Sequence, residues 1–82
     1  MPTVLRQGAL RVVVYPNDHR PAHVHVIGGG SEAVFRLNCP SGPVELRENY
    51  RFSAGALATI SAELDRALAR LCGEWERIHG IA

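Results

Sequence analysis

Three of the four histidines lie close together, within residues 18–26, which read DHRPAHVHV. His23 and His25 alternate with valines, and a period of two is typical of a β-strand, on which residues i and i+2 share a face. The two imidazoles are therefore expected to project side by side, with Asp18 and His19 just upstream in a proline-bounded turn. Because imidazole titrates near neutral pH and is the commonest metal ligand, this cluster is the strongest candidate for a functional site.

The cluster has the residue types of a divalent transition-metal site, for example a zinc site. His23 and His25 would be two ligands, Asp18 or His19 would be a third, and one position would stay open for water. A metal there would lower the pKa of the bound water and so favour hydrolysis. The alternative is a pair of hydrogen-bonding surface histidines, with Asp18 capping its own turn.

Two arginines are candidate binding residues at the edge of this cluster. Arg36 is expected on the same sheet face as the histidines, where its guanidinium could hold a phosphate or a carboxylate in a bidentate manner. The alternative for Arg36 is an ion pair with Glu32. Arg20 lies inside the histidine-bearing loop and is the second candidate.

The first half of the chain predicts antiparallel strands over 10–15, 22–27 and 31–37, with a short fourth strand or edge segment at 44–46. Three consecutive glycines, 28–30, predict the turn of a hairpin. Pairing Val24 with Phe35, and therefore His23 with Arg36, leaves one face apolar and the other polar. A slip by one residue would mix the two faces, so burial should select this register.

The second half predicts helix over 53–80, with Ser53 as N-cap and Gly80 as the stop. Its apolar residues recur at spacings of three and four, as in an amphipathic helix. A single straight helix of that length would measure about 40 Å. We therefore expect either a bend near 63–65 or an overhang that meets a partner. The expected core packs the sheet residues Val24, Val26, Phe35 and Leu37 against Leu57, Ile60, Leu64 and Leu71, with His23 and His25 pointing away.

These patterns predict a single α+β domain over 1–82, with the sheet in 1–50 and the helical part in 53–80. The sheet should have three or four antiparallel strands, followed by one long or two consecutive C-terminal helices packed on one face. A chain of 82 residues has a small core, so we expect a homodimer or one half of a heterodimer.

Composition limits the partners and the location. The net charge of +1 does not indicate nucleic-acid binding, although it does not exclude it, and no apolar run is long enough to span a membrane. The opening residues lack the apolar segment of a secretory signal, and Cys39 and Cys72 form no CxxC motif. We therefore expect a cytoplasmic protein with two reduced cysteines, each acting as a small buried apolar residue.

The chain resembles a bacterial family of short proteins, the domain-of-unknown-function family 4160. The resemblance covers nearly the whole length and rests on four stretches: the opening 1–8 (MPTVLRQG), the Pro21-x-His23-Val24-His25-Val26 motif, Ala33-x-Phe35-x-Leu37, and Glu74-Trp75. It implies a small α+β domain that is often encoded beside a second small protein, as in toxin–antitoxin pairs. It implies no catalytic residues.

Two classes of function follow from these observations. The first, which we favour, is a small interaction module, as in one component of a toxin–antitoxin-like pair, with the histidine-rich strand face as its functional surface. The second is a small metal-dependent or histidine-based hydrolase or nuclease that uses the same face. A weaker similarity to histidine-triad nucleotide hydrolases fails, because the alternation ends at His25 and Ile27 occupies the next position.

Overall fold

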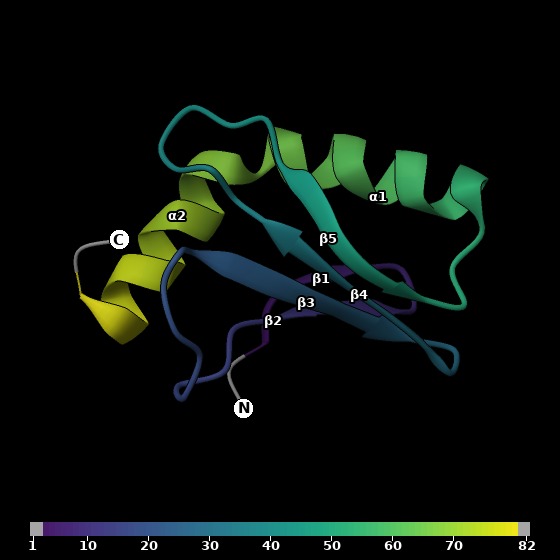
Figure 1. The fold of residues 1–82 in the computed structure, drawn as a ribbon, viewed down its shortest axis with the longest axis horizontal. Coiled ribbons are helices and arrows are strands. Elements are labelled where there is room, and N and C mark those ends of the chain that lie inside the picture. Colours follow the sequence, from purple (N-terminus) through teal and green to yellow (C-terminus); the bar gives the residue numbers. More distant parts are fainter. Residues whose placement is uncertain (1–2, 81–82) are drawn as a thin grey trace.

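The strands form one antiparallel sheet. The structure is a computed structural model, and it describes residues 3–80 apart from the side chain of Gln7. Each strand pairs with the next one along the chain, so the five strands form a meander in the order β1-β2-β3-β4-β5 (Figure 1). Their bounds are β1 Thr3–Gln7, β2 Leu10–Val13, β3 His23–Gly28, β4 Ser31–Arg36 and β5 Glu45–Tyr50. The α+β class is confirmed, and the sheet has five strands where three or four are expected.

The two edge strands differ from the expectation: β1 is additional, and β5 is longer than the expected segment. β1 pairs with β2 through a turn in which Gly8 has a φ of +59°, a conformation that favours glycine. β5 extends well beyond the expected 44–46, and every one of its residues is exposed. An exposed edge strand has no buried face, so it lacks the alternation of polar and apolar residues that identifies a half-buried strand.

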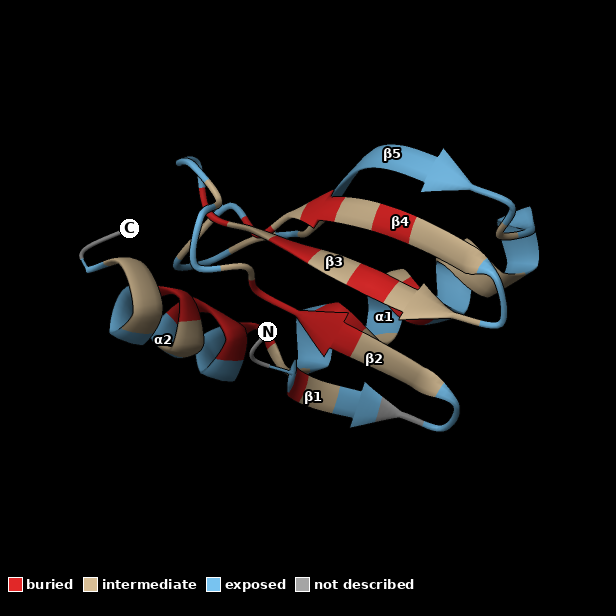
Figure 2. Cartoon of the chain, turned by 90° about the horizontal axis from the view of Figure 1, so that it is seen from below, coloured by how far each residue is buried: buried red, intermediate tan, exposed pale blue. Residues whose placement is uncertain are grey.

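The predicted register of the central hairpin is confirmed. Val24 pairs with Phe35, His25 with Val34 and His23 with Arg36. Burial alternates along β3 and β4, as Figure 2 shows, and the buried set on these two strands is fully covered: Val24, Val26, Ala33 and Phe35. The histidines consequently occupy the opposite face from the core.

The helical part consists of α1 (Ala54–Arg66) and α2 (Leu68–His79). Ser53 is the N-cap as predicted, and its hydroxyl accepts a hydrogen bond from the Ala56 amide at 3.1 Å. The helix breaks at Ala67, whose φ of −100° and ψ of 11° leave the helical region, and not at 63–65. Because the helical part is two short helices and not one straight helix of about 40 Å, the argument for a partner from an overhanging long helix does not hold.

The two helices cover different parts of the core. α1 crosses one face of the sheet, and α2 lies toward the end where β3 begins (Figure 1). The predicted helical core residues Ile60, Leu64 and Leu71 are buried, and Leu57 is partly buried against the same cluster. The expectation that both histidines point away from the helices is wrong for His23, because its ring centroid lies 5.3 Å from that of Trp75 in α2.

Cys39 and Cys72 form a disulfide, with their Cα atoms 5.9 Å apart. The expectation of two separate reduced thiols is therefore wrong. The reason is tertiary: the loop after β4 passes over the middle of α2, which brings together two residues 33 positions apart in the sequence. Among the described residues, no helix is long and apolar enough to cross a membrane.

Candidate metal centre

Asp18 is positioned by the turn that follows β2. The Asp18 amide donates to the Tyr15 carbonyl at 3.0 Å, and the Tyr15 amide donates to the Asp18 carboxylate at 3.2 Å. Asp18 therefore closes its own turn, as the structural alternative predicted. The same closure fixes the carboxylate over the start of β3, so the structural role and a ligand role are compatible.

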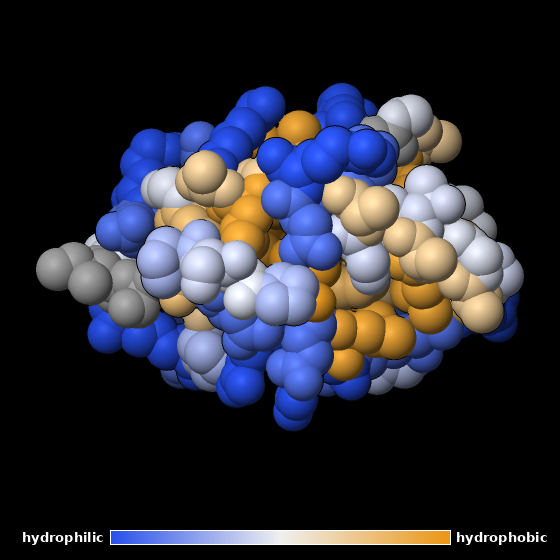
Figure 3. Space-filling view, turned by 90° about the horizontal axis from the view of Figure 1, so that it is seen from above, coloured by the Kyte–Doolittle hydropathy of each residue, from blue (hydrophilic) through white to orange (hydrophobic). Residues whose placement is uncertain are grey.

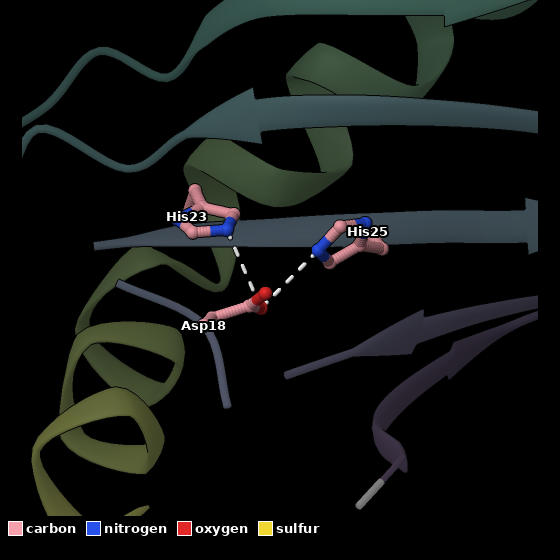
Figure 4. Close-up of side chains that lie close together, drawn as sticks. All are labelled: Asp18, His23 and His25. Carbon is pink, nitrogen blue, oxygen red and sulfur yellow. Dashed lines mark hydrogen bonds and ion pairs between the residues drawn. The ribbon is translucent and has the colours of Figure 1, made fainter. Parts of the chain in front are cut away.

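His23 and His25 converge on this carboxylate. The Nε2 atoms of His23 and His25 lie 3.3 Å and 3.2 Å from the same oxygen, Oδ2 of Asp18 (Figure 4). One ligand atom from each of the three residues lies within 4.8 Å of the others. All three side chains are mostly buried, with 16–19% of their surface exposed. The two histidines, which share one face of β3, thus point toward the same carboxylate oxygen.

The other nitrogen of each ring also has a partner. Nδ1 of His23 lies 2.9 Å from the Pro21 carbonyl, and Nδ1 of His25 lies 3.3 Å from the Glu32 carboxylate. Histidines that bind a metal commonly donate their second N–H to a carbonyl or a carboxylate, which fixes the ring and its tautomer. Both imidazoles here have such a partner.

If both rings are neutral, the hydrogen positions that these partners require leave one lone pair of each ring facing a carboxylate. The Pro21 carbonyl only accepts, so the proton of a neutral His23 ring is on Nδ1 and Nε2 presents a lone pair to Asp18. His25 lies between two carboxylates, so a neutral ring would also leave one lone pair against a carboxylate. A single cation between the two Nε2 atoms and Asp18 would satisfy both rings at once.

Two of the three ligand separations suit a small metal ion. Two ligands at about 2.0 Å from a tetrahedral zinc ion are about 3.3 Å apart. The two Nε2–Oδ2 distances of 3.3 Å and 3.2 Å match this value. Two imidazoles and one carboxylate would occupy three positions of such an ion and leave one for water.

Aromatic side chains enclose one side of the cluster. Tyr15 meets His25 edge-on with ring centroids 4.6 Å apart, and Trp75 packs against His23. His79 stacks on Trp75 at 4.0 Å, and its Nε2 lies 3.0 Å from the Tyr15 carbonyl. Trp75 is fully buried, and its Nε1–H has no acceptor among the described residues. α2 therefore closes the cluster from the side of the sheet end.

The structure separates the candidate residues into two groups. His19 is exposed and is not among the residues whose ligand atoms converge. Arg36 lies 4.0 Å from Glu45, whereas Glu32, its partner in the alternative interpretation, contacts His25. The contact between Glu32 and His25 was not expected. The register predicts it, because Glu32 is a diagonal neighbour of His25 on the next strand.

The contribution of α2 to the cluster was also missed. Trp75 and His79 lie in the helical half of the sequence, and nothing in the helical period specifies which strand they meet. Their contact with His23 and Tyr15 depends on where the break at Ala67 directs the second helix.

Residues 10–76 match the family model described as "Domain of unknown function (DUF4160)". The chain belongs to this family. The DUF4160 match extends from β2 into α2 and includes Asp18, His23 and His25, so the whole candidate centre lies within the family domain. No curated protein and no solved structure matches the chain.

Proposed function

We propose that this DUF4160 chain is a small metal-binding interaction module, with a divalent transition metal such as zinc held by Asp18, His23 and His25. One observation carries the proposal: both Nδ1 atoms already have acceptors, while both Nε2 atoms face a single carboxylate oxygen. A bound metal would fix the turn at Asp18 to β3 and make the histidine face a rigid surface for a partner.

Zinc titration by calorimetry, with a competing chelator, tests the metal. Wild type is expected to bind one zinc ion, and the His23→Ala/His25→Ala variant is expected to lose at least about 100-fold in affinity, since two of three ligands are gone. His19→Ala is the matched control, because His19 is an exposed histidine of the same loop outside the cluster. Equal zinc affinity in wild type and the double variant would refute the site.

The partner in this proposal is a cognate small protein encoded beside the chain, as in a toxin–antitoxin-like pair, or a second copy of the chain. Both edge strands carry a bulge, in β1 between residues 3 and 5 and in β5 opposite residues 34 and 35. Bulges and charges protect edges from pairing with other strands. On the face shown in Figure 3, apolar patches are separated by polar side chains. The protected edges favour docking on the histidine face over extension of the sheet.

Co-expression with the adjacent gene product tests the partner. We expect a complex that survives gel filtration in zinc and dissociates in the His23→Ala/His25→Ala variant, while His19→Ala retains it. Sedimentation of the chain alone distinguishes a homodimer from a monomer that needs the cognate protein. A single monomeric species with no complex would contradict the module.

A second candidate function is a metal-dependent hydrolase or nuclease on the same face. The observation that favours it is that three protein ligands leave a coordination position for a water molecule, which a metal would activate. Release of nitrophenolate from a nitrophenyl phosphate ester by the zinc-loaded protein, absent in the His23→Ala/His25→Ala variant, would support this function. Equal rates in the two proteins would reject it.

We also propose a cytoplasmic location, the one that the sequence analysis expects. The Cys39–Cys72 bond argues for an oxidising compartment, because disulfides are rare in the cytosol of most organisms. Alkylation of the protein inside intact cells, followed by mass spectrometry, decides between the cytoplasm and an oxidising compartment. Reduced cysteines support the cytoplasm, and an intact bond refutes it.

A further inference from the structure

A pocket of about 570 Å³ lies at the end of the sheet where β3 begins and β4 ends. Three segments form it: the loop before β3, the end of β4 and the loop after β4. Its lining residues are Arg20, Pro21, Ala22, Arg36, Asn38 and Cys39. The Cys39–Cys72 bond anchors one wall to α2, and the Asn38 side-chain amide donates to the Pro43 carbonyl at 2.9 Å. Internal bonds therefore hold the loop after β4 in place.

The pocket shares a boundary with the candidate metal centre. Pro21, which lines the pocket, accepts the hydrogen bond from Nδ1 of His23 at 2.9 Å. Arg36, which also lines it, is the direct cross-strand partner of His23. Side chains of such partners begin about 4.5–5.5 Å apart on the same face. His23 thus separates the two sites, with Nε2 toward Asp18 and Nδ1 toward the pocket wall.

The pocket is cationic. Arg20 and Arg36 are its charged residues, and none of the lining residues carries a carboxylate. The nearest carboxylate partner of Arg36 is Glu45 at 4.0 Å, and both side chains are more than a third exposed, so this ion pair is weak. A guanidinium has five N–H donors in a planar fork, so this one contact leaves several for a ligand.

We propose that this pocket binds the phosphoryl group of a small phosphorylated molecule, beside the metal. Two guanidiniums, each with five N–H donors, offer more hydrogen bonds to the three acceptor oxygens of a phosphate monoester than the two oxygens of a carboxylate can accept. The volume is typical of a small-molecule site, and the net charge of +1 gives no extended field for a polynucleotide. The inference rests on the proposed function only in placing the ligand next to a metal, because the arginine pocket exists without one.

Binding of inorganic phosphate to the full chain, followed by calorimetry in a chelator and again with zinc, tests the pocket. We expect the Arg20→Gln/Arg36→Gln variant to bind phosphate at least about tenfold more weakly than wild type, because charge-assisted hydrogen bonds are lost. The matched control is Arg6→Gln/Arg51→Gln, which removes two arginines at the opposite end of the sheet. Phosphate affinity that is unchanged in the first variant, or reduced equally in the control, would overturn the proposal.

Two further measurements test the pocket without relying on a folded variant and distinguish the class of ligand. Backbone amide shifts of the wild type should respond to phosphate at Arg20, at Ala22 and at residues 36–39, which needs no variant to fold. Acetate should bind more weakly than phosphate, and an oligonucleotide should bind no more tightly. Amide shifts elsewhere, or tighter binding of acetate or an oligonucleotide, would overturn the assignment.

The two proposals fail separately. If zinc does not bind, the metal proposal falls, and phosphate binding in the chelator still decides the pocket. If phosphate does not bind but zinc does, the pocket proposal falls alone.

Discussion

At the scale of single residues, the candidate site depends on one oxygen. Oδ2 of Asp18 is close to the Tyr15 amide and to Nε2 of both His23 and His25. The carboxylate that caps the turn also contacts two imidazoles. The same oxygen therefore serves both the turn and the candidate metal site. Glu32 and Pro21 then fix the far side of each ring.

The carboxylate behind His25 offers a test that leaves every metal ligand in place. Glu32→Gln should lower zinc affinity about 10-fold to 100-fold, because partners of metal-bound histidines orient the ring and raise its basicity. Chelator competition measures the effect. Glu48→Gln is the control, since Glu48 is an exposed carboxylate of the neighbouring strand whose side chain bonds Tyr50. A zinc affinity identical in the two variants would mean that Glu32 does not support the site.

The pH dependence separates a metal site from a pair of protonated histidines. Metal ligation needs unprotonated Nε2 atoms and releases protons, so zinc affinity should be lower at about pH 5.5 than at about pH 7.5. An anion held by charged rings would bind more strongly over the same interval. Titrations of zinc and of phosphate at both pH values, with the His23→Ala/His25→Ala variant as control, measure the sign. Zinc affinity that rises on acidification would contradict metal ligation.

At the scale of elements, one face of the β3–β4 hairpin forms the core and the other carries the candidate site. The core face carries Val24 and Phe35, which are fully buried, and the other face carries the histidines and Arg36. The helices stabilise the first face, and the turn after β2 covers part of the second. The break at Ala67 directs α2 toward the end of the sheet, where Trp75 reaches His23.

Truncating the central core residue should show how strongly the sheet depends on this face. Phe35→Ala should reduce the free energy of unfolding by about 3–5 kcal/mol, because Phe35 is fully buried against the helices. Leu46→Ala is the control, since Leu46 pairs with Phe35 from β5 but is 42% exposed, and it should cost about 0.5 kcal/mol or less. Urea denaturation measures both. Equal losses would mean that the edge strand is as buried as the centre.

Two glycines should respond to alanine in opposite directions. Gly73→Ala should stabilise the fold by about 0.5–1 kcal/mol, because Gly73 lies within α2 and a Cβ there meets nothing within 4 Å. Gly42→Ala should destabilise it by more than that, because Gly42 has a φ of +71° and a Cβ would lie 2.7 Å from Leu68. Thermal unfolding of the two variants gives the signs. A stabilising Gly42→Ala would show that the loop after β4 adopts another conformation.

At the scale of the whole molecule, the disulfide compensates for the small size of the core. It closes a long loop between the end of the sheet and α2, and it borders the pocket. A chain of 82 residues buries a smaller share of its surface than a larger domain, so covalent restraint of the unfolded state has a large relative effect.

Removing the bond measures that contribution. Cys39→Ser/Cys72→Ser should lower the free energy of unfolding by about 2–4 kcal/mol, as expected for a loop of this length. Denaturant titrations of wild type with and without a reductant, beside the same titrations of the variant, measure it. The reductant should destabilise wild type and leave the variant unchanged. A reductant effect of equal size in both proteins would show that the bond is not its cause.

The sequence alone determined what depends on local periodicity. The alternation around His23 and His25 defined β3, the glycine turn and the burial of one face defined its register with β4, and the three-to-four spacing after Ser53 defined the helical half. Each of these follows from residues near one another in the chain, since a one-residue slip or a different period would expose apolar side chains. The α+β class and the location of the histidine cluster followed from the same signals.

Only the tertiary structure decided which distant residues meet. It places Asp18, and not His19, beside the imidazoles, and it pairs Glu32 with His25. It also joins Cys39 to Cys72 and places Trp75 against His23. These contacts depend on the turn after β2, the helix break at Ala67 and the path of the loop after β4. No periodicity encodes them, because each is fixed by how separate elements pack around a shared core and not by the order of residues within one element.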